Sequence, residues 1–417
     1  MKILHVIHAY TPAIGGTEFL IQQVSEYLAN TAGEEVTVFT TFAYNTTLFT
    51  DAKAPAVPAQ REEETINGVK VKRFPVINRW GKALYFLQYI FYRLRLLGNG
   101  RLRMLYYGPI SPAMKKAVKH FPADIIISSP FPLNHMNYVF KNKGKAPVVL
   151  VGCMHTEDQH GFKNPLVTRA IKRADGYIAL TDHEKEYLVS RLGIPAAKIR
   201  VIGVGLKTAS PVPGKKEIRT LLNIKKDDAP LIAFVGQHGL HKGIETLISA
   251  MPLVWRRFPG TRLVIAGGKT PFTDSFKKLS RFIADQNGGE EKIFFLDNVN
   301  EETKSAVLSG CDIFTTPSGM ESFGITILEA WSRKKPVVAC RISATMSLIQ
   351  EYNTGLLVDY KDTGELGQAL VELAADKELR KKIGKNGFKK WQADYSWEHV
   401  GNKYYDFYRE VAGAHTL

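Results

Sequence analysis

Short apolar runs alternate along the whole chain with longer stretches whose apolar positions recur every three or four residues. The short runs, such as ILHVI at 3–7 and LIAFV at 231–235, predict buried strands, and the stretches between them predict amphipathic helices. The alternation predicts an α/β fold. It stops at the Pro-, Gly- and Lys-rich segment SPVPGKK and then starts again, which predicts two domains joined by a linker at 208–216.

The richest chemistry lies in PSGMESFGITILEA, residues 317–330, between a predicted buried strand and a helix that ends before Pro336. Backbone amides at the start of such a helix favour a bound anion. Glu329, one to two turns into the helix, can accept both hydrogens of a vicinal diol such as a ribose, and Glu321 can hold a second sugar. The segment therefore suits a nucleotide-sugar. A plain strand–helix crossover with two solvated glutamates is the alternative.

Residues 317–330 resemble the signature of retaining glycosyltransferases of the family-four type, which have the GT-B fold. Two further motifs resemble the same family: PAIGGTE at 12–18, which matches its first glycine loop, and the Lys242-Gly243 pair that closes the loop after residues 231–235. The resemblance covers nearly the whole chain and is weakest at 79–107.

The resemblance implies a specific architecture. It predicts two Rossmann-like domains with doubly wound parallel sheets that face a cleft, the first at 1–207 for the acceptor and the second at 217–396 for the nucleotide-sugar donor. It also predicts that the C-terminal helix, about 397–417, crosses back to the first domain.

The resemblance also implies roles for individual residues. His155 is expected to contact the donor sugar near the reacting carbon, Lys242 to neutralise the departing diphosphate, and Glu321 to bind donor hydroxyls; these three are the expected catalytic residues. The residues expected to bind the donor are Gly15, Gly16, Gly236, Gln237, Lys242, Asn298, Val299, Ser322, Phe323, Gly324 and Glu329.

The chain departs from the family pattern at two places. Gln237 stands where the family has an arginine that helps to neutralise the diphosphate, and Lys269 or His238 are candidates to replace that arginine. Ser343 and Ala344 stand where the family usually has two glycines. Both departures weaken the expected donor contacts.

The expected activity is a retaining, hexosyltransferase-type transfer from a nucleotide-diphosphate sugar to a hydroxyl of a lipid-linked or polysaccharide acceptor in cell-surface glycan assembly. The sequence contains no Asp-x-Asp motif, so we expect no metal ion and no other cofactor. Two alternatives remain: a catalytically degenerate GT-B paralogue that binds nucleotide-sugar as a scaffold subunit, and another GT-B enzyme such as a nucleotide-sugar epimerase.

The formal net charge of +16 is unevenly distributed, because residues 65–123 contain twelve Lys and Arg and no Asp or Glu. Such a surface predicts an anionic partner. Residues 79–107 combine aromatic and basic side chains, and we weigh three interpretations: a core helix with snorkelling arginines, an interfacial segment on acidic lipid, and nucleic-acid binding. No nucleic-acid module accompanies the charge, so nucleic acid is not expected as a partner. The predicted membrane or acceptor patch comprises Arg93, Arg95, Arg101 and Arg103.

Cys153, Cys311 and Cys340 all lie in apolar runs, which predicts buried thiols in a reducing compartment. The first residues are too short an apolar run for a signal peptide, and no stretch reaches the roughly 18 apolar residues of a membrane span. We therefore expect a cytoplasmic protein, peripheral at the inner face of the plasma membrane. The cluster of Cys153, His155, Glu157, Asp158 and His160 suggests a metal site, but it has neither a CxxC nor an HExxH spacing.

Overall fold

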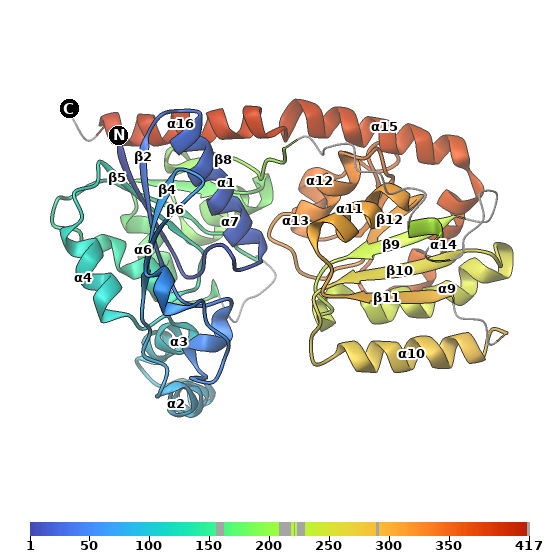
Figure 1. Ribbon diagram of the computed structural model, residues 1–417, viewed down its shortest axis with the longest axis horizontal. Helices are drawn as coiled ribbons and strands as arrows, with labels where there is room; N and C mark the ends of the chain where they lie inside the picture. The colour runs from blue at the N-terminus through green and yellow to red at the C-terminus, as the bar shows by residue number, and fades with distance from the viewer. Residues whose placement is uncertain (156–161, 208–217, 221, 223–229, 289–291, 415–417) are drawn as a thin grey trace. The chain divides into compact units, whose positions relative to one another are not determined.

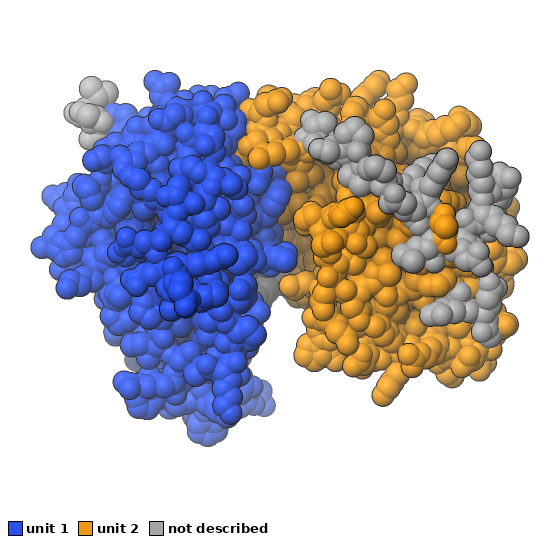
Figure 2. Space-filling model, in the orientation of Figure 1, with its two compact units in different colours: residues 1–205, 400–417 blue, residues 206–399 orange. Residues whose placement is uncertain are grey.

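The computed structural model divides the chain into two compact units, coloured separately in Figure 2. Unit 1 comprises residues 1–205 and 400–417, and unit 2 comprises residues 206–399. The predicted linker at 208–216 lies outside the described residues. The structure describes residues 1–155, 162–207, 218–220, 222, 230–288 and 292–414.

Unit 1 is built on a sheet of eight described strands, which are parallel except at one edge (Figure 1). Its central strands are almost completely buried, as expected for a parallel sheet with helices on its faces. The order across the sheet is β3 (Glu63–Ile66), β4 (Val69–Phe74), β2 (Glu35–Thr41), β1 (Lys2–Ile7), β5 (Ile125–Ser129), β6 (Val148–Val151), β7 (Gly176–Ala179) and β8 (Ile199–Val201).

The antiparallel edge strand β3 is a feature that the sequence analysis did not anticipate. It forms a hairpin with β4 through Asn67 and Gly68, whose φ angles are 47° and 82°. Two successive positive φ angles are typical of the tight turn that joins hairpin strands, and Asn-Gly is the dipeptide that best adopts it. This dipeptide was the available sequence signal.

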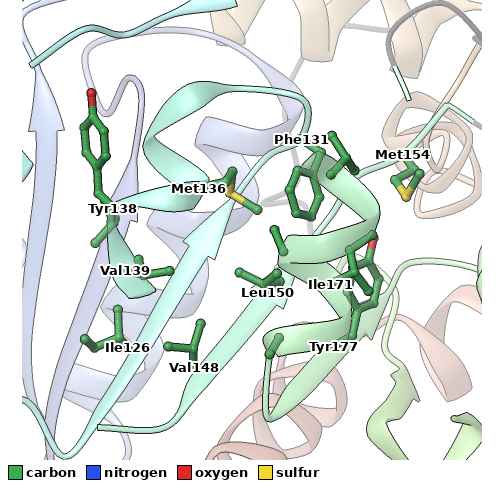
Figure 3. Close-up of a cluster of buried hydrophobic side chains, with 14 of the residues drawn as sticks. Ile126, Phe131, Met136, Tyr138, Val139, Val148, Leu150, Met154, Ile171 and Tyr177 are labelled. Atoms are coloured by element: carbon green, nitrogen blue, oxygen red, sulfur yellow. The ribbon is translucent and has the colours of Figure 1, made fainter. Parts of the chain in front are cut away.

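The helices of unit 1 enclose a core on the sheet, part of which Figure 3 shows. Ile126 of β5 and Leu150 of β6 lie with Ile171 of α6 in one buried cluster. The helices are α1 (Gly16–Asn30), α2 (Gly81–Arg93), α3 (Asn99–Tyr107), α4 (Pro112–His120), α6 (Pro165–Arg173) and α7 (Asp182–Leu192).

The C-terminal helix α16 (Trp397–Ala414) joins unit 1 from Val400 onward. The Tyr27 hydroxyl of α1 donates to Asn402 Oδ1 at 2.7 Å. The ring of Tyr408 meets His5 of β1 edge-on, with 6.0 Å between the centroids. The prediction that the last helix packs on the first domain is therefore confirmed.

Unit 2 contains a second sheet, in which all the described strands are parallel. Its order is β11 (Ile293–Asp297), β10 (Arg262–Gly267), β9 (Leu231–Val235), β12 (Ile313–Thr316), β13 (Val337–Cys340) and β14 (Leu356–Val358). Its helices are α9 (Ile244–Arg257), α10 (Thr273–Asp285), α11 (Glu301–Gly310), α12 (Ile325–Trp331), α13 (Ser343–Leu348), α14 (Thr363–Ala375) and α15 (Lys377–Asp394). Two α/β domains with parallel sheets are thus confirmed.

Two further expectations concern membranes and thiols. Within the described ranges, every helix is too short or too polar to span a bilayer. Cys153, Cys311 and Cys340 are free and buried, as predicted.

Candidate functional site

The predicted donor residues of unit 2 lie in the loops that follow three strands of its sheet. Gly236 and Gln237 follow β9, Asn298 and Val299 follow β11, and Glu321 belongs to the loop after β12. Strands β11, β10, β9 and β12 are consecutive in the sheet. Their carboxyl ends therefore share one edge, which is where open parallel sheets bind ligands.

A glycine holds two of these loops together. Gly243 has a φ of 69°, and a Cβ atom at this position would lie 2.0 Å from the carbonyl oxygen of Pro317. Next to it, the amide of Gly319 donates to the carbonyl oxygen of His241 at 2.8 Å. Only a residue without a side chain permits this approach, so the loop after β9 rests directly on the loop after β12.

This contact brings Lys242 and Glu321 together. Lys242 Nζ lies 2.6 Å from Glu321 Oε1, and the two side chains are 19% and 17% exposed. The family resemblance implies separate ligands for these residues, a diphosphate for Lys242 and a sugar for Glu321. In the structure they bind each other, so a ligand that uses either residue must compete with the ion pair.

Glu329 is also paired, by a residue that the sequence analysis missed. Lys304 Nζ on α11 lies 2.7 Å from Glu329 Oε1 and 2.8 Å from Glu301 Oε2. Burial alone would lower the pKa of Lys304, but the two carboxylates outweigh it and raise the pKa. Lys304 is therefore charged and orients Glu329. The pairing depends on how α11 lies beside α12, which no local pattern reveals.

The start of α12 offers backbone groups rather than side chains. Gly324 precedes the helix with a φ of 111°, and no side chain caps the helix amides. Phe323 is buried, and its ring packs edge-on against Tyr395 at 5.7 Å between centroids. Ser322 is half-buried. The side chain of Phe323 is thus part of the core, and only its backbone is suited to contact a donor.

The arginine position of the family is occupied by an exposed glutamine, Gln237. His238 does not replace it, because its buried ring lies 3.2 Å from Thr273 Oγ1, and burial lowers its pKa more than the Asp297 carboxylate raises it. This candidate was wrong, since a buried neutral imidazole cannot neutralise a diphosphate. Lys269 is partly exposed, with its Nζ 3.9 Å from Asp297 Oδ2, and remains a candidate.

Asn298 shapes the loop after β11. Its φ of 53° is left-handed, a conformation that asparagine tolerates. Its amide donates to the carbonyl oxygen of Gly267 at 2.6 Å, and its side-chain Oδ1 accepts from the amide of Lys269 at 2.9 Å. Asn298 therefore ties the loops after β10 and β11, and the half-buried Val299 follows it.

In unit 1 the glycine pair begins α1. Gly15 precedes the helix as its N-cap residue and provides no side-chain cap, and Gly16 is the first residue of the helix. The φ of Gly15 is −175°, which any residue adopts. A Cβ atom here would instead lie 2.3 Å from Glu18 Oε2. Glycine at position 15 thus makes room for the Glu18 carboxylate, which accepts a hydrogen bond from its own backbone amide in the first turn of α1.

Glu18 belongs to a buried polar cluster that the sequence analysis missed. His8, just after β1, has its Nε2 3.0 Å from Glu18 Oε1, and the His135 ring stacks on the His8 ring at 6.1 Å. Burial raises the pKa of Glu18, but the charge and hydrogen bond of His8 bring it below its ordinary value. Burial lowers the pKa of His135 to about 3, so this ring is neutral. The only sequence signal was the position of Glu18 in the glycine motif.

His155 follows β6 at the equivalent edge of the first sheet. The strand end is held by Glu184, whose Oε1 accepts from the amide of Met154 at 3.5 Å and from the Tyr177 hydroxyl at 2.7 Å. The His155 ring is half-buried and lies 6.3 Å from the ring of Phe162.

Of the five residues considered as a metal site, the structure describes Cys153 and His155. Burial raises the pKa of Cys153 to about 12, so it is a neutral thiol and a poor metal ligand. Glu157, Asp158 and His160 lie outside the described residues. Across the described part of the chain, no three His, Cys, Asp or Glu residues are grouped to hold a metal ion.

The four arginines of the predicted basic patch differ in their exposure to solvent. Arg93, Arg95 and Arg101 are exposed, but Arg103 is only 4% exposed and its guanidinium lies 5.5 Å from the ring centroid of Tyr92. Arg103 therefore does not belong to the exposed patch, because α3 turns it under the aromatic ring. The core-helix interpretation was wrong for α2, which buries only Gly81 and Gln88, whereas α3 places Met104 in the core.

Two family models match the chain, one in each half. The model described as Glycosyltransferase Family 4 matches residues 14–210, and the model described as Glycosyl transferases group 1 matches residues 216–390.

Similar proteins agree with these matches. The α-D-kanosaminyltransferase of Streptomyces kanamyceticus is 26% identical over 246 residues, which are 58% of this chain and 62% of that protein. The chain thus aligns with less than two thirds of that relative's length. Sucrose-phosphate synthase from Thermosynechococcus elongatus has the same fold, with a TM-score of 0.71, 21% identity and coverage of 99% and 100% of the two chains. Anabaena HepE, solved in complex with UDP-glucose, also has this fold. Its TM-score is 0.68 and its sequence identity is 16%, with coverage of 98% of this chain and 99% of that chain.

Proposed function

Because the chain is a glycosyltransferase of the family-four type with the GT-B fold, we propose that it transfers a sugar from a nucleotide-diphosphate sugar to a hydroxyl of a lipid-linked or polysaccharide acceptor. The transfer retains the anomeric configuration and needs no metal ion. The observation that carries the proposal is the Lys242–Glu321 pair at the edge where β9 and β12 end. It joins a cation suited to a diphosphate with a carboxylate suited to sugar hydroxyls.

The donor-binding residues must stabilise the negative charge that develops on the leaving diphosphate. When the bond from the anomeric carbon to the diphosphate breaks, negative charge grows on the leaving phosphate. Lys242 stabilises this charge together with uncapped amides at the start of α12. Glu321 exchanges the ammonium group for donor hydroxyls, which leaves Lys242 free for the phosphates. Glu329, oriented by Lys304, accepts the two ribose hydroxyls.

The exposed surface of unit 1, the expected acceptor domain, supports contact with a membrane. Unit 1 exposes aromatic side chains of α2 beside Arg93, Arg95 and Arg101. Cations near an acidic membrane surface contribute about 1 kcal/mol each. Peripheral contact with the inner face of the plasma membrane therefore fits a role in lipopolysaccharide or exopolysaccharide assembly.

The first test is a thermal-shift panel of the protein with UDP-, GDP-, ADP- and dTDP-sugars. A ligand at 100 times its Kd stabilises the folded state by about 2.7 kcal/mol, which is readily measured. One nucleotide should raise the melting temperature, and Lys242→Ala and Glu329→Ala should each remove the shift. The matched control is Lys278→Ala, because Lys278 is exposed on α10 and should leave the shift unchanged. If no nucleotide-sugar shifts the protein, the proposal fails.

Gln237 motivates a second candidate, a subunit that binds nucleotide-sugar without turnover. With one cation fewer than the family, the site holds the donor less firmly in the transition state. This candidate predicts a thermal shift with a donor but no release of free nucleotide with any acceptor extract. Release of nucleotide that requires both an acceptor and Lys242 would exclude it.

A further inference from the structure

Arg103 on α3 is a buried cation without an anionic partner among the described residues. Its Nε and Nη2 atoms are inaccessible, and no described group accepts a hydrogen bond from them. Its guanidinium lies over the face of the Tyr92 ring, 5.5 Å from the ring centroid. The guanidinium is always charged, so it cannot avoid the cost by losing a proton.

The contact with Tyr92 stabilises Arg103 by less than the burial of its charge costs. Burying a charge without a partner costs several kcal/mol, and a cation–π contact returns about 0.5–2 kcal/mol. Arg73 shows how the same unit treats another fully buried arginine: its Nη2 donates to Glu64 Oε1 at 2.7 Å and to the carbonyl oxygen of Thr11 at 2.6 Å. No carboxylate of the described residues is paired with Arg103 in this way, so an anion from outside the chain can fill this place.

The groups around Arg103 suit an anion that also carries a hydroxyl group or bound water to donate a hydrogen bond. Asn99 lies four residues earlier on the same helix face, and its buried Oδ1 also has no described partner. Residues 65–123 contain no Asp or Glu, so this segment offers no competing anion of its own. A phosphate ester fits these groups, since its oxygens accept from a guanidinium fork.

The surface next to Arg103 indicates what carries the phosphate. Helix α2 packs on α3, and α3 in turn packs on α6, so α2 is the outer layer of this end of unit 1 (Figure 1). Phe86 is 63% exposed and Leu97 is 96% exposed. The other exposed large apolar side chains of this surface are Trp80, Tyr85, Leu87, Tyr89, Tyr92, Leu94 and Leu96. An apolar surface of this size is unusual for a protein that meets only water.

We propose that α2 and α3 bind the phosphate group of a lipid, with Arg103 as the anion-binding residue. The exposed aromatic side chains of α2 contact the lipid chain, and Tyr92 moves aside to admit the phosphate. The inference deepens the proposed function and rests on it for the identity of the lipid as acceptor or membrane. The binding itself requires no sugar transfer, so the two proposals can fail separately.

The test uses two arginines of one helix that differ in burial. Calorimetry measures the binding of decyl phosphate, decanol and inorganic phosphate to the full chain, below the critical micelle concentration. Decyl phosphate should bind at least tenfold more tightly than either of the other two compounds. Arg103→Gln should weaken this binding at least tenfold, whereas Arg101→Gln, which removes the same charge from the exposed face of α3, should change it less than twofold.

Several outcomes would overturn the proposal. If Arg101→Gln and Arg103→Gln weaken binding equally, the effect is the general charge of the surface. If neither weakens it, Arg103 holds no phosphate. Arg103→Met separates binding from folding: we expect its melting temperature without ligand to be no lower than that of the unmodified chain, because an unpaired buried charge is removed. A fall of several degrees would show a structural role and would contradict the proposal.

Vesicles distinguish the source of the phosphate. We would compare phosphatidylcholine vesicles with and without phosphatidylglycerol by flotation. If Arg103→Gln loses more vesicle binding than Arg101→Gln, the phosphate is that of a membrane phospholipid. If the two variants float equally and only decyl phosphate binding is lost, the site takes an individual lipid phosphate such as that of an acceptor. Both outcomes support a lipid-phosphate site, and the nucleotide-sugar panel tests sugar transfer independently.

Discussion

Removing the Glu321 carboxylate should strengthen the binding of a nucleoside diphosphate while it weakens sugar transfer. Lys242 Nζ lies 2.6 Å from Glu321 Oε1, so the carboxylate competes with the phosphates for the same cation. Glu321→Gln keeps the shape of the side chain but removes its charge. The freed ammonium group should therefore meet the diphosphate without first breaking an ion pair. The variant also loses the acceptor of donor hydroxyls, so turnover should fall.

The size of the gain follows from the burial of the pair. A hydrogen bond to a charged group contributes about 1.5–3 kcal/mol when it is shielded, and a fully exposed ion pair contributes about 0–1 kcal/mol. The two side chains are 19% and 17% exposed, which places the pair between these limits. We expect about 1–2 kcal/mol, which corresponds to a roughly 5- to 30-fold lower Kd for the diphosphate.

The assay is calorimetric titration with UDP, GDP and ADP. The nucleotide that binds the unmodified chain should bind Glu321→Gln more tightly, and the double variant Lys242→Met/Glu321→Gln should show no gain, because the cation is absent. The matched control is Glu245→Gln, which removes an exposed carboxylate three residues after Lys242 and should leave Kd within twofold. Unchanged or weaker binding to Glu321→Gln would refute the reasoning, since Lys242 would then not be held back by Glu321.

Three further predictions follow from single positions. Gly243→Ala should destabilise unit 2 by at least about 2 kcal/mol and abolish donor binding, because its Cβ would lie 2.0 Å from the Pro317 oxygen at a left-handed φ; thermal melting checks it, and an unchanged melt contradicts the contact. Gln237→Arg should tighten nucleoside diphosphate binding about tenfold by restoring a cation; an unchanged Kd in calorimetry means that position 237 does not face the diphosphate. Burial raises the pKa of Glu184 from its ordinary 4.5 to about 7, so its stabilisation is complete below pH 4.5 and is lost as the pH rises through 7. Glu184→Gln should flatten the decline in melting temperature between pH 5 and pH 8, and an equally steep decline in both proteins would exclude Glu184 as its source.

Much of the fold could be predicted because the relevant patterns are local. Burial on both faces makes a parallel strand continuously apolar, as in LIAFV at 231–235, and an amphipathic helix shows its 3.6-residue period within a dozen positions. These signals gave two α/β domains, and the resemblance added the return of α16 to unit 1. The hairpin at Asn67 and Gly68 was missed although its turn signal was local.

The candidate site was predicted as a set of residue types without their partners. The expected roles of Lys242, Glu321 and Glu329 rest on motif resemblance, and these roles stay predictions. That Glu329 pairs with Lys304 and that Arg103 turns inward could not be read from spacing. Each depends on the side that one helix presents to another, which only packing fixes.

The sequence by itself determined which residues lie at the ends of strands, because apolar runs and glycine positions are patterns of neighbouring residues. The tertiary structure alone decided which of these residues meet. Gly243 and Pro317 are far apart in the chain, and their contact joins Lys242 to Glu321. An ion pair needs two side chains within about 4 Å, and a distance of that kind is set by the packing of whole strands and loops.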